Sequence, residues 1–230
     1  NETIIDENCG LAIESTMIFH SPEIKEKLEE MGIPVMVERS SYESHPLGRM
    51  EWIKLYGILC DKEEEADAFF EEQTANLNEI LTGDQTGKKV AFFYISSAGY
   101  VNVRKPGDYI SKMIEMAGGT YALADMEVEE DNALSTLNMQ MEDFFANVQD
   151  ADILIDNSTI EGGIDTLDQL YAKNKLFKEF KAAKEGQVWC TESNVFQETT
   201  GAAKMISELY TIIHDEKASD EGLECFHRVK

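Results

Sequence analysis

The sequence has few positive charges for its length. Its 230 residues include 45 Asp and Glu against 20 Lys and Arg, which gives a formal net charge of −25. Because proteins bind polyanions mainly through Lys and Arg, this charge argues against nucleic acid as a partner. The densest acidic runs, at 63–65 and 127–131, predict solvated faces of helices and loops.

The sequence also lacks a long apolar run. No stretch approaches the ~18 residues that a membrane-spanning helix needs. The chain opens at Asn1 without the charged and apolar regions of an export signal. We therefore expect this chain neither to span a membrane nor to carry its own export signal. With 43% hydrophobic residues it can bury the core of one large or two small domains.

Common cysteine and catalytic motifs are missing as well. Cys9, Cys60, Cys190 and Cys225 form no C-x-x-C pair, which argues against a zinc cluster and favours buried thiols over disulfides. There is no G-x-S-x-G, H-E-x-x-H or G-x-G-x-x-G. The segment 83–89 differs from a phosphate loop, because only three residues separate its glycines and it precedes a strand. Nothing in the sequence therefore favours a hydrolase or a dehydrogenase.

Short β-like runs alternate with longer helical runs, a pattern typical of an α/β protein with parallel strands. In the first part of the chain the pattern predicts strands at 10–14 and 33–37 and helices at 22–31 and about 46–59. After the loop-like residues 82–87 it predicts strands at 89–94, 152–156 and 187–190 and helices at 108–117, 138–147, 165–173 and 199–214.

A single long helix is expected between these two parts. Asp61 would cap it and Glu64 is placed to close a capping box, while an apolar stripe runs to Leu81. At 1.5 Å per residue its ~20 residues span ~30 Å. We thus predict the remnant of an N-terminal α/β lobe at 1–60, the helix between lobes at 61–82, a C-terminal α/β lobe at 83–215 and a tail at 216–230.

Polar and aromatic residues follow the predicted strands. Ligands of open parallel sheets bind outside the carboxyl ends of the strands. In this chain the corresponding loops are rich in Tyr, Asn, Ser and Gly, and they run over 15–20, 40–45, 96–104, 157–163 and 192–197. Arg49 and Arg104 are conspicuous cations in or beside these loops. The pattern predicts that the loops form the two sides of one cleft.

The segment Ser41–Lys54, S-Y-E-S-H-P-L-G-R-M-E-W-I-K, resembles the substrate-binding proteins of iron-complex and cobalamin ABC importers. Similar segments follow in the right order at 109–119, which ends in M-A-G-G, and at 151–155 and 180–188. The resemblance covers nearly the whole chain. It implies an α/β fold of two lobes with mainly parallel sheets, bridged by one long helix, with the ligand held between the lobes.

The family pattern starts near Glu2 in this chain. Full members of the family carry further strands and helices of the N-terminal lobe and, before them, a secretion signal that is often of the lipoprotein type. The N-terminal lobe is therefore expected to be incomplete, either because the sequence is an excerpt or because it is a natural short form. An incomplete sheet with exposed edges would invite dimerisation.

The resemblance places the loop around Arg104 at the cleft. There a guanidinium could clamp the oxygens of a metal chelate, although a surface cation is the alternative. Tyr94 and Tyr100 either stack on the ligand or pack in the core. His20 and His45 could ligate haem iron or corrinoid cobalt, whereas a structural hydrogen bond is the commoner role.

Further candidate ligand contacts are Tyr42, Glu43, Arg49, Asn157 and Phe196. For Glu43 and Arg49, which flank the start of a predicted helix, a mutual salt bridge competes with ligand contact. No catalytic residue and no metal site built from protein ligands alone is predicted.

Together these observations predict a binding protein and not an enzyme. It would be the extracytoplasmic receptor of an ABC importer, a cell-surface lipoprotein or a periplasmic protein, for an iron-siderophore, haem or a corrinoid. A receptor for a free divalent metal ion and a ligand-free partner-binding module are the alternatives. No cofactor is expected, and membrane attachment would need a lipid anchor that this chain lacks. The resemblance further implies that Glu142 and Glu2 dock onto the permease.

Overall fold

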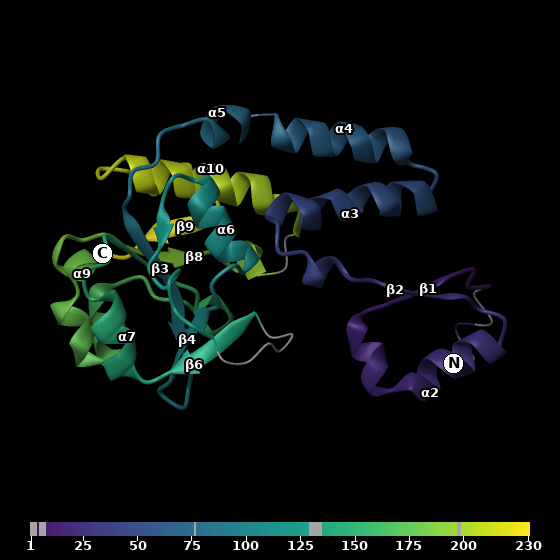
Figure 1. Ribbon diagram of the computed structural model, residues 1–230, viewed down its shortest axis with the longest axis horizontal. Coiled ribbons are helices and arrows are strands. Elements are labelled where there is room, and N and C mark those ends of the chain that lie inside the picture. The colour runs from purple at the N-terminus through teal and green to yellow at the C-terminus, as the bar shows by residue number, and fades with distance from the viewer. Residues whose placement is uncertain (1–3, 5–7, 76, 129–134, 197–198) are drawn as a thin grey trace. The chain divides into compact units, whose positions relative to one another are not determined.

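The computed structural model describes residues 4, 8–75, 77–128, 135–196 and 199–230, with the side chain of Phe196 excepted. Its contacts divide the chain into two compact units, Asn1–Glu43 (unit 1) and Ser44–Lys230 (unit 2). Each unit has a sheet of its own (Figure 1). The assignment of 61–82 as a helix between lobes, with its flanking domain boundaries, stays a prediction. None of the described helices is both long and apolar enough to cross a membrane.

Unit 1 is one βαβ unit, as its hydrophobic pattern predicts. Strand β1 (Ala12–Glu14) pairs in parallel with β2 (Val35–Val37), and η1 (Thr16–His20) and α2 (Pro22–Glu30) connect them. The short 3-10 helix η2 (Ser40–Tyr42) follows β2. The described apolar side chains buried in this unit are Ile18, Leu28 and Ile33. A two-stranded sheet covers little apolar surface, so the unit has only a small core.

The sheet of unit 2 is mixed, and the prediction of mainly parallel strands is wrong for it. Its strands are β3 (Lys89–Ile95), β4 (Val101–Arg104), β5 (Thr120–Tyr121), β6 (Thr136–Met139), β7 (Ile153–Asp156), β8 (Val188–Thr191) and β9 (Phe226–Arg228). They lie in the order β6-β4-β3-β7-β8-β9, with β5 beside the start of β3. The pairs β3–β5, β3–β7 and β7–β8 are parallel, whereas β3–β4, β4–β6 and β8–β9 are antiparallel.

The antiparallel strands arise where the sequence pattern does not predict them. Strands β3 and β4 form a hairpin whose turn holds Gly99 at φ +84°, a conformation that favours glycine. The pattern predicts a helix over 138–147, but residues 136–139 form β6 and the helix begins only at Met141. Residues 136–139 pair with all four residues of β4. This pairing outweighs their local preference for a helix, because strand formation depends strongly on neighbouring strands.

Helices cover both faces of this sheet (Figure 1). They are α3 (Pro46–Leu59), α4 (Glu63–Thr74), α5 (Leu77–Leu81), α6 (Tyr109–Met116), α7 (Met141–Val148), α8 (Leu167–Lys173), α9 (Lys181–Lys184) and α10 (Ala202–His214). The 3-10 helices are η3 (Thr159–Glu161), η4 (Lys175–Glu179), η5 (Ser193–Phe196) and η6 (Thr199–Gly201). Helices α6 and α10 pack together, and α3 and α5 contact α10.

A cluster of phenylalanines forms the core beneath α7 and η4. The Phe93 ring of β3 lies 5.0 Å from Phe144 and 5.4 Å from Phe177, measured between ring centroids. Phe180 stacks on Phe177 at 5.1 Å. All four rings are fully buried. Aromatic pairs of this kind contribute beyond their buried area, so this cluster anchors the central strand.

Helices α3 and α4 form a hairpin, and the predicted cap at Asp61 is wrong. Asp61 has a left-handed φ of 57°, while the N–H of Lys62 donates to the Gly57 carbonyl at 2.7 Å. This is the Schellman arrangement that ends a helix, so Asp61 terminates α3 and does not begin α4. The predicted single helix over 61–81 is divided as well, because α4 ends at Thr74 and α5 begins at Leu77.

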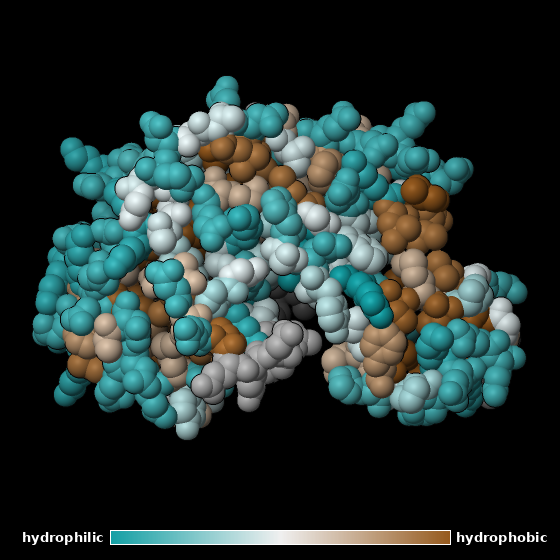
Figure 2. Space-filling view, in the orientation of Figure 1, coloured by the Kyte–Doolittle hydropathy of each residue, from teal (hydrophilic) through white to brown (hydrophobic). Residues whose placement is uncertain are grey.

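The cysteines differ in exposure. Cys190 and Cys225 are buried, Cys9 is half-buried and Cys60 is exposed at the α3–α4 turn. Ile58 and Leu59 beside Cys60 are also exposed. Figure 2 shows hydrophobic residues gathered at the right-hand end of the two helices. The expectation of buried thiols therefore fails for Cys60.

Gly57→Ala should destabilise the α3–α4 hairpin. A Cβ atom at position 57 would lie 2.5 Å from Cβ of Ala66 and 3.0 Å from the Lys62 carbonyl oxygen. Overpacking costs about 1 to 3 kcal/mol, and only part of this is offset by the better helix propensity of alanine. Chemical denaturation should show a lower free energy of unfolding.

The matched control is the double variant Gly57→Ala/Ala66→Gly, which removes the methyl group that the new Cβ would meet. It should be less destabilised than the sum of the two single variants. Strict additivity would contradict the close approach of the two helices.

Candidate functional site

Three parallel strands end along one edge of the unit 2 sheet. Strands β3, β7 and β8 end at Ile95, Asp156 and Thr191. This carboxyl edge is where open α/β sheets place their ligands. The loops that follow carry most of the site residues predicted for unit 2, so we take the edge as the candidate site.

A buried aspartate paired with a half-buried lysine holds the loop after β7. The Asp156 side chain is fully buried, and its Oδ2 lies 3.5 Å from Nζ of Lys173 on α8. The Ser158 N–H donates to Asp156 Oδ1 at 2.8 Å, and Lys173 also donates to the Ser158 hydroxyl at 2.9 Å. Burial raises the pKa of Asp156, and the charge of Lys173 opposes this rise. The carboxylate thereby fixes the backbone on both sides of Asn157.

The antiparallel strands β3, β4 and β6 carry a polar and aromatic face beside the loop after β7. Tyr94 pairs with Asn102 in the antiparallel register, and the guanidinium carbon of Arg104 lies 5.8 Å from the ring centroid of Phe92. A small recess of about 10 Å³ is lined by these four side chains together with Asn157. Asn102 donates through Nδ2 to Oδ1 of Asn138 on β6 at 2.9 Å. The face thus combines aromatic rings with amide groups and a guanidinium.

Two arginines from different elements, Arg49 of α3 and Arg104 of β4, lie over the ring of Tyr109. The Arg49 guanidinium carbon lies 3.7 Å from the ring centroid of Tyr109, and that of Arg104 lies 5.4 Å away. Arg104 also approaches the buried carboxylate of Asp108 at 3.9 Å. Burial raises the pKa of Asp108, and the positive charges of Arg104 and Arg49 act against it. This arrangement places two cations beside the aromatic face.

The structure brings several of the predicted ligand residues together. Tyr94, Arg104 and Asn157 line the same recess, and Arg49 and Arg104 share Tyr109. Tyr100 lies at the exposed tip of the β3–β4 hairpin, outside the recess. The side chain of Phe196 lies outside the described part of the chain.

The predicted residues of unit 1 occupy its loops. His20 ends η1, Tyr42 ends η2 and is 61% exposed, and Glu43 caps η2. In unit 2, His45 caps α3, because its Nδ1 accepts the Leu47 N–H at 3.3 Å. His45 thus has the structural role that the sequence left open.

Three partners of the site were not singled out as site residues. They are Lys173, Thr159 and Thr191, which come from α8, η3 and the end of β8. Thr159 lies in the predicted cleft loop 157–163, whereas Lys173 and Thr191 have no such signal, because each contacts residues far away along the chain. Among the described residues no group of three or more His, Cys, Asp or Glu could hold a metal ion.

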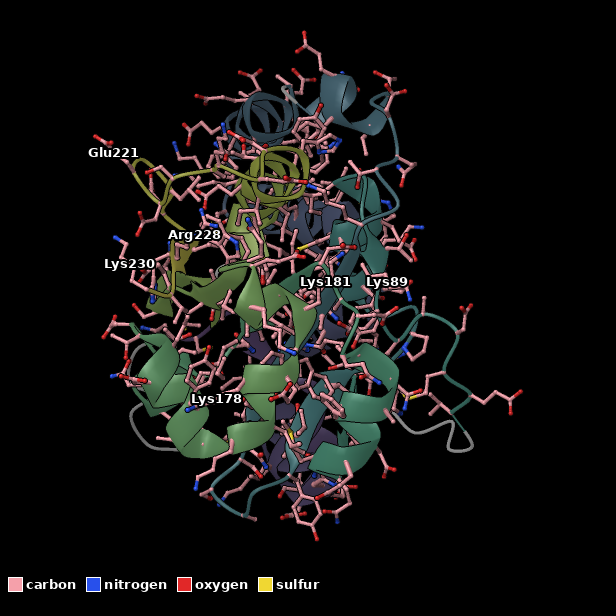
Figure 3. The ribbon with its side chains drawn as sticks, turned by 90° about the vertical axis from the view of Figure 1, so that its left-hand side faces the viewer. Lys89, Lys178, Lys181, Glu221, Arg228 and Lys230 are labelled. Atoms are coloured by element: carbon pink, nitrogen blue, oxygen red, sulfur yellow. The ribbon has the colours of Figure 1, made fainter. Side chains whose placement is uncertain are left out.

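Larger hollows lie elsewhere on unit 2. One of about 750 Å³ is lined by Lys89, Lys181 and Lys184, and Figure 3 shows Lys89 and Lys181 near each other. The amines of Lys89 and Lys184 pair with Asp150 and Glu179 at 2.7 and 2.9 Å. Since β3 begins at Lys89, this hollow is at the opposite edge of the sheet, and its cations are already neutralised. We therefore do not take it as the ligand site.

Comparisons with known proteins identify the fold. No protein-family model matches the sequence. Two uncharacterized lipoproteins of Methanocaldococcus jannaschii are 29% and 25% identical over 196 and 215 residues, which are 83% and 90% of this chain. The chain spans 44% and 53% of the length of these relatives.

Solved binding proteins share the fold at low sequence identity. A periplasmic haem-binding protein of Vibrio cholerae matches with a TM-score of 0.73 and 15% identity over 93% of this chain and 80% of its own. An Fe³⁺-hydroxamate transport system protein of Saccharomonospora viridis gives 0.67 and 17%, over 93% and 72%. A vitamin B12-binding protein of Vibrio cholerae gives 0.58 and 15%, over 93% and 78%.

The chain therefore has the fold of periplasmic substrate-binding proteins of iron-siderophore, haem and vitamin B12 importers, and it covers about 72–80% of these three. These structural neighbours are binding proteins and not enzymes.

The buried Asp156 should give a specific pH dependence. Its pKa is raised above the ordinary 3.8, so the folded protein holds this proton more tightly than the unfolded chain does. This contribution to stability is largest at low pH, and it falls as the pH rises from about 4 through the folded pKa. Asp156→Asn removes this decline and keeps an oxygen to accept the Ser158 N–H.

The free energy of unfolding of Asp156→Asn minus that of the wild type should increase as the pH rises. Urea denaturation at a series of pH values measures it. Asp168→Asn on the exposed first turn of α8 controls for the loss of one carboxylate. A difference that is constant with pH would contradict the burial effect.

Proposed function

We propose that this chain is the substrate-binding part of an ABC importer and that its ligand is a metal chelate, an iron-siderophore, haem or a corrinoid. The observation that carries the proposal is the cluster of Tyr94, Arg104 and Asn157 at the carboxyl edge of a sheet with this fold. A guanidinium and an amide offer hydrogen-bond donors to ligand oxygens, while the aromatic rings offer flat apolar contact.

The remaining predicted contacts belong to the same proposal. Arg49 and Tyr100 would contribute from unit 2, and His20, Tyr42 and Glu43 from unit 1. A two-lobed architecture is proposed on the same basis. An extracytoplasmic location is proposed as well, since the curated relatives are lipoproteins. Dimerisation through the small sheet of unit 1 also stays a proposal.

Ligand extraction tests the function directly. Protein purified from its native source would be denatured, and the released small molecules identified by mass spectrometry together with the visible absorption of the protein. A metal chelate in stoichiometric amount is the expected result. A chain that repeatedly carries no such ligand and binds none of the chelates named below would contradict the proposal.

Arg104→Ala should weaken chelate binding. Removing a charge-assisted hydrogen bond costs about 1.5 to 3 kcal/mol, which is roughly a 10- to 150-fold change in Kd. Calorimetry with a ferric trihydroxamate, haemin and cyanocobalamin would show which ligand binds and by how much its affinity falls. Lys112→Ala removes an equal charge from an exposed pair on α6 and should leave the affinity unchanged. Equal affinity of Arg104→Ala and wild type would leave Arg104 with a structural role beside Asp108 and Tyr109.

Docking onto a permease is the remaining part of the proposal. Glu142 is exposed on the first turn of α7, where it is free to face a partner, while Glu2 lies outside the described residues. Charged groups at an interface steer association and fix orientation.

Glu142→Arg should abolish uptake by a reconstituted importer and leave ligand affinity intact. Asp168→Arg reverses an exposed acid in the first turn of α8 and is the matched control, with transport retained. Full transport by Glu142→Arg would show that this residue does not dock.

A further inference from the structure

Two threonine hydroxyls and the Asn157 carboxamide form a chain at the carboxyl edge. Thr191 is fully buried at the end of β8, and its hydroxyl donates to Asn157 Oδ1 at 3.0 Å. The hydroxyl oxygens of Thr159 and Thr191 lie 2.7 Å apart. A hydroxyl has one hydrogen, and that of Thr191 is directed to Asn157. Thr159 is therefore the donor to Thr191.

The direction of this chain follows from the orientation of the Asn157 amide, which turns Oδ1 toward the Thr191 hydroxyl. Its Oδ1 is occupied by Thr191, which leaves the Nδ2 amino group on the other side. Among the described residues, Nδ2 has no hydrogen-bond partner. Asn157 also lines the recess that contains Tyr94 and Arg104. The groups that Asn157 has left for a ligand beside this recess are therefore amide hydrogens.

The backbone around Asn157 is held just as firmly. Its N–H donates to the Phe93 carbonyl at 2.7 Å, and the Asp156 carboxylate accepts the Ser158 N–H. Because the main chain is fixed, only rotation about the side-chain bonds of Asn157 remains free. The hydrogen bond from the Thr191 hydroxyl restricts this rotation.

We propose that Thr191 and Thr159 are positioning residues that turn Asn157 into a hydrogen-bond donor for the ligand. Asn157 in this orientation and Arg104 then both offer hydrogen-bond donors at the recess. Such a site selects a chelate that presents acceptor oxygens, such as a hydroxamate, a catecholate or a carboxylate. The choice of ligand class rests on the proposed function, whereas the orientation of Asn157 does not.

The orientation is tested first on the ligand-free full chain. Nuclear magnetic resonance of ¹⁵N-labelled protein reports the Asn157 side-chain amide, which is identified by its loss in Asn157→Asp. In the wild type and Thr191→Ser, its couplings should indicate one rotamer. In Thr191→Val, which has the same shape without the hydroxyl, they should be averaged. Unchanged Asn157 couplings in Thr191→Val would overturn the inference.

A second variant covers the case in which Thr191→Val does not fold. Thr159→Val alters the half-buried outer member of the chain, so the core around β8 stays intact. It should shift the Asn157 amide signals in the same direction by a smaller amount. Thr211→Val on exposed α10 surface is the control, and it should leave them in place. Identical spectra of Thr159→Val and wild type would overturn the chain of hydroxyls.

Binding then tests the donor role with a ferric trihydroxamate as the probe. Loss of one neutral hydrogen bond corresponds to about a 2- to 12-fold rise in Kd, expected for Thr191→Val, with Thr191→Ser near wild type. Asn157→Asp should lose more, because a carboxylate repels acceptor oxygens. Equal binding by Asn157→Asp would overturn the donor role. A wild type that binds no chelate while the amide couplings behave as expected would contradict the proposed function and leave the orientation standing.

Discussion

The fully buried carboxylate of Asp156 is the constraint on which the carboxyl edge depends. An unpaired charge in the interior is very costly, so the loop after β7 must bring it a cation and hydrogen-bond donors. Lys173 supplies the charge from α8, and the Ser158 N–H supplies a donor. Meeting both needs fixes residues 156–158, so Asn157 between them has little conformational choice.

The alternating pattern of the sequence predicts most of the parallel framework. Strands β3, β7 and β8 are continuous apolar runs, and helices α6 and α10 have clear periodicity, so their local signal agrees with their tertiary environment. The β4–β6 pairing has no such signal, because four-residue strands are stabilised mainly by the partner strand. Asp61 shows a similar limit: an aspartate before an acidic run predicts a cap, whereas the turn after α3 determines its conformation.

The candidate site divides in the same way. Tyr94 and Asn157 could be predicted, because they end or follow parallel strands whose carboxyl ends meet at one edge. Arg104 was predicted as part of the loop 96–104 after the first of these strands, and that segment instead contains the antiparallel strand β4. Their supporting residues could not, since Lys173 and Thr191 lie 17 and 34 residues from the groups they contact. Such contacts depend on the register between strands and helices, which no local pattern encodes. Sequence thus locates the recess, but only the structure gives the direction of its hydrogen bonds.

The unequal exposure of the cysteines has a practical chemical consequence. Thiol reagents attack the thiolate, and burial raises the pKa of Cys190 to about 11, so this sulfur reacts slowly near neutral pH. Cys60, at the α3–α4 turn, is open to solvent. A maleimide dye or a spin label would therefore attach preferentially beside the helix hairpin, far along the chain from Asn157 and its threonines. The protein thus carries a natural attachment point from which a spectroscopic probe can follow the hairpin without altering the recess.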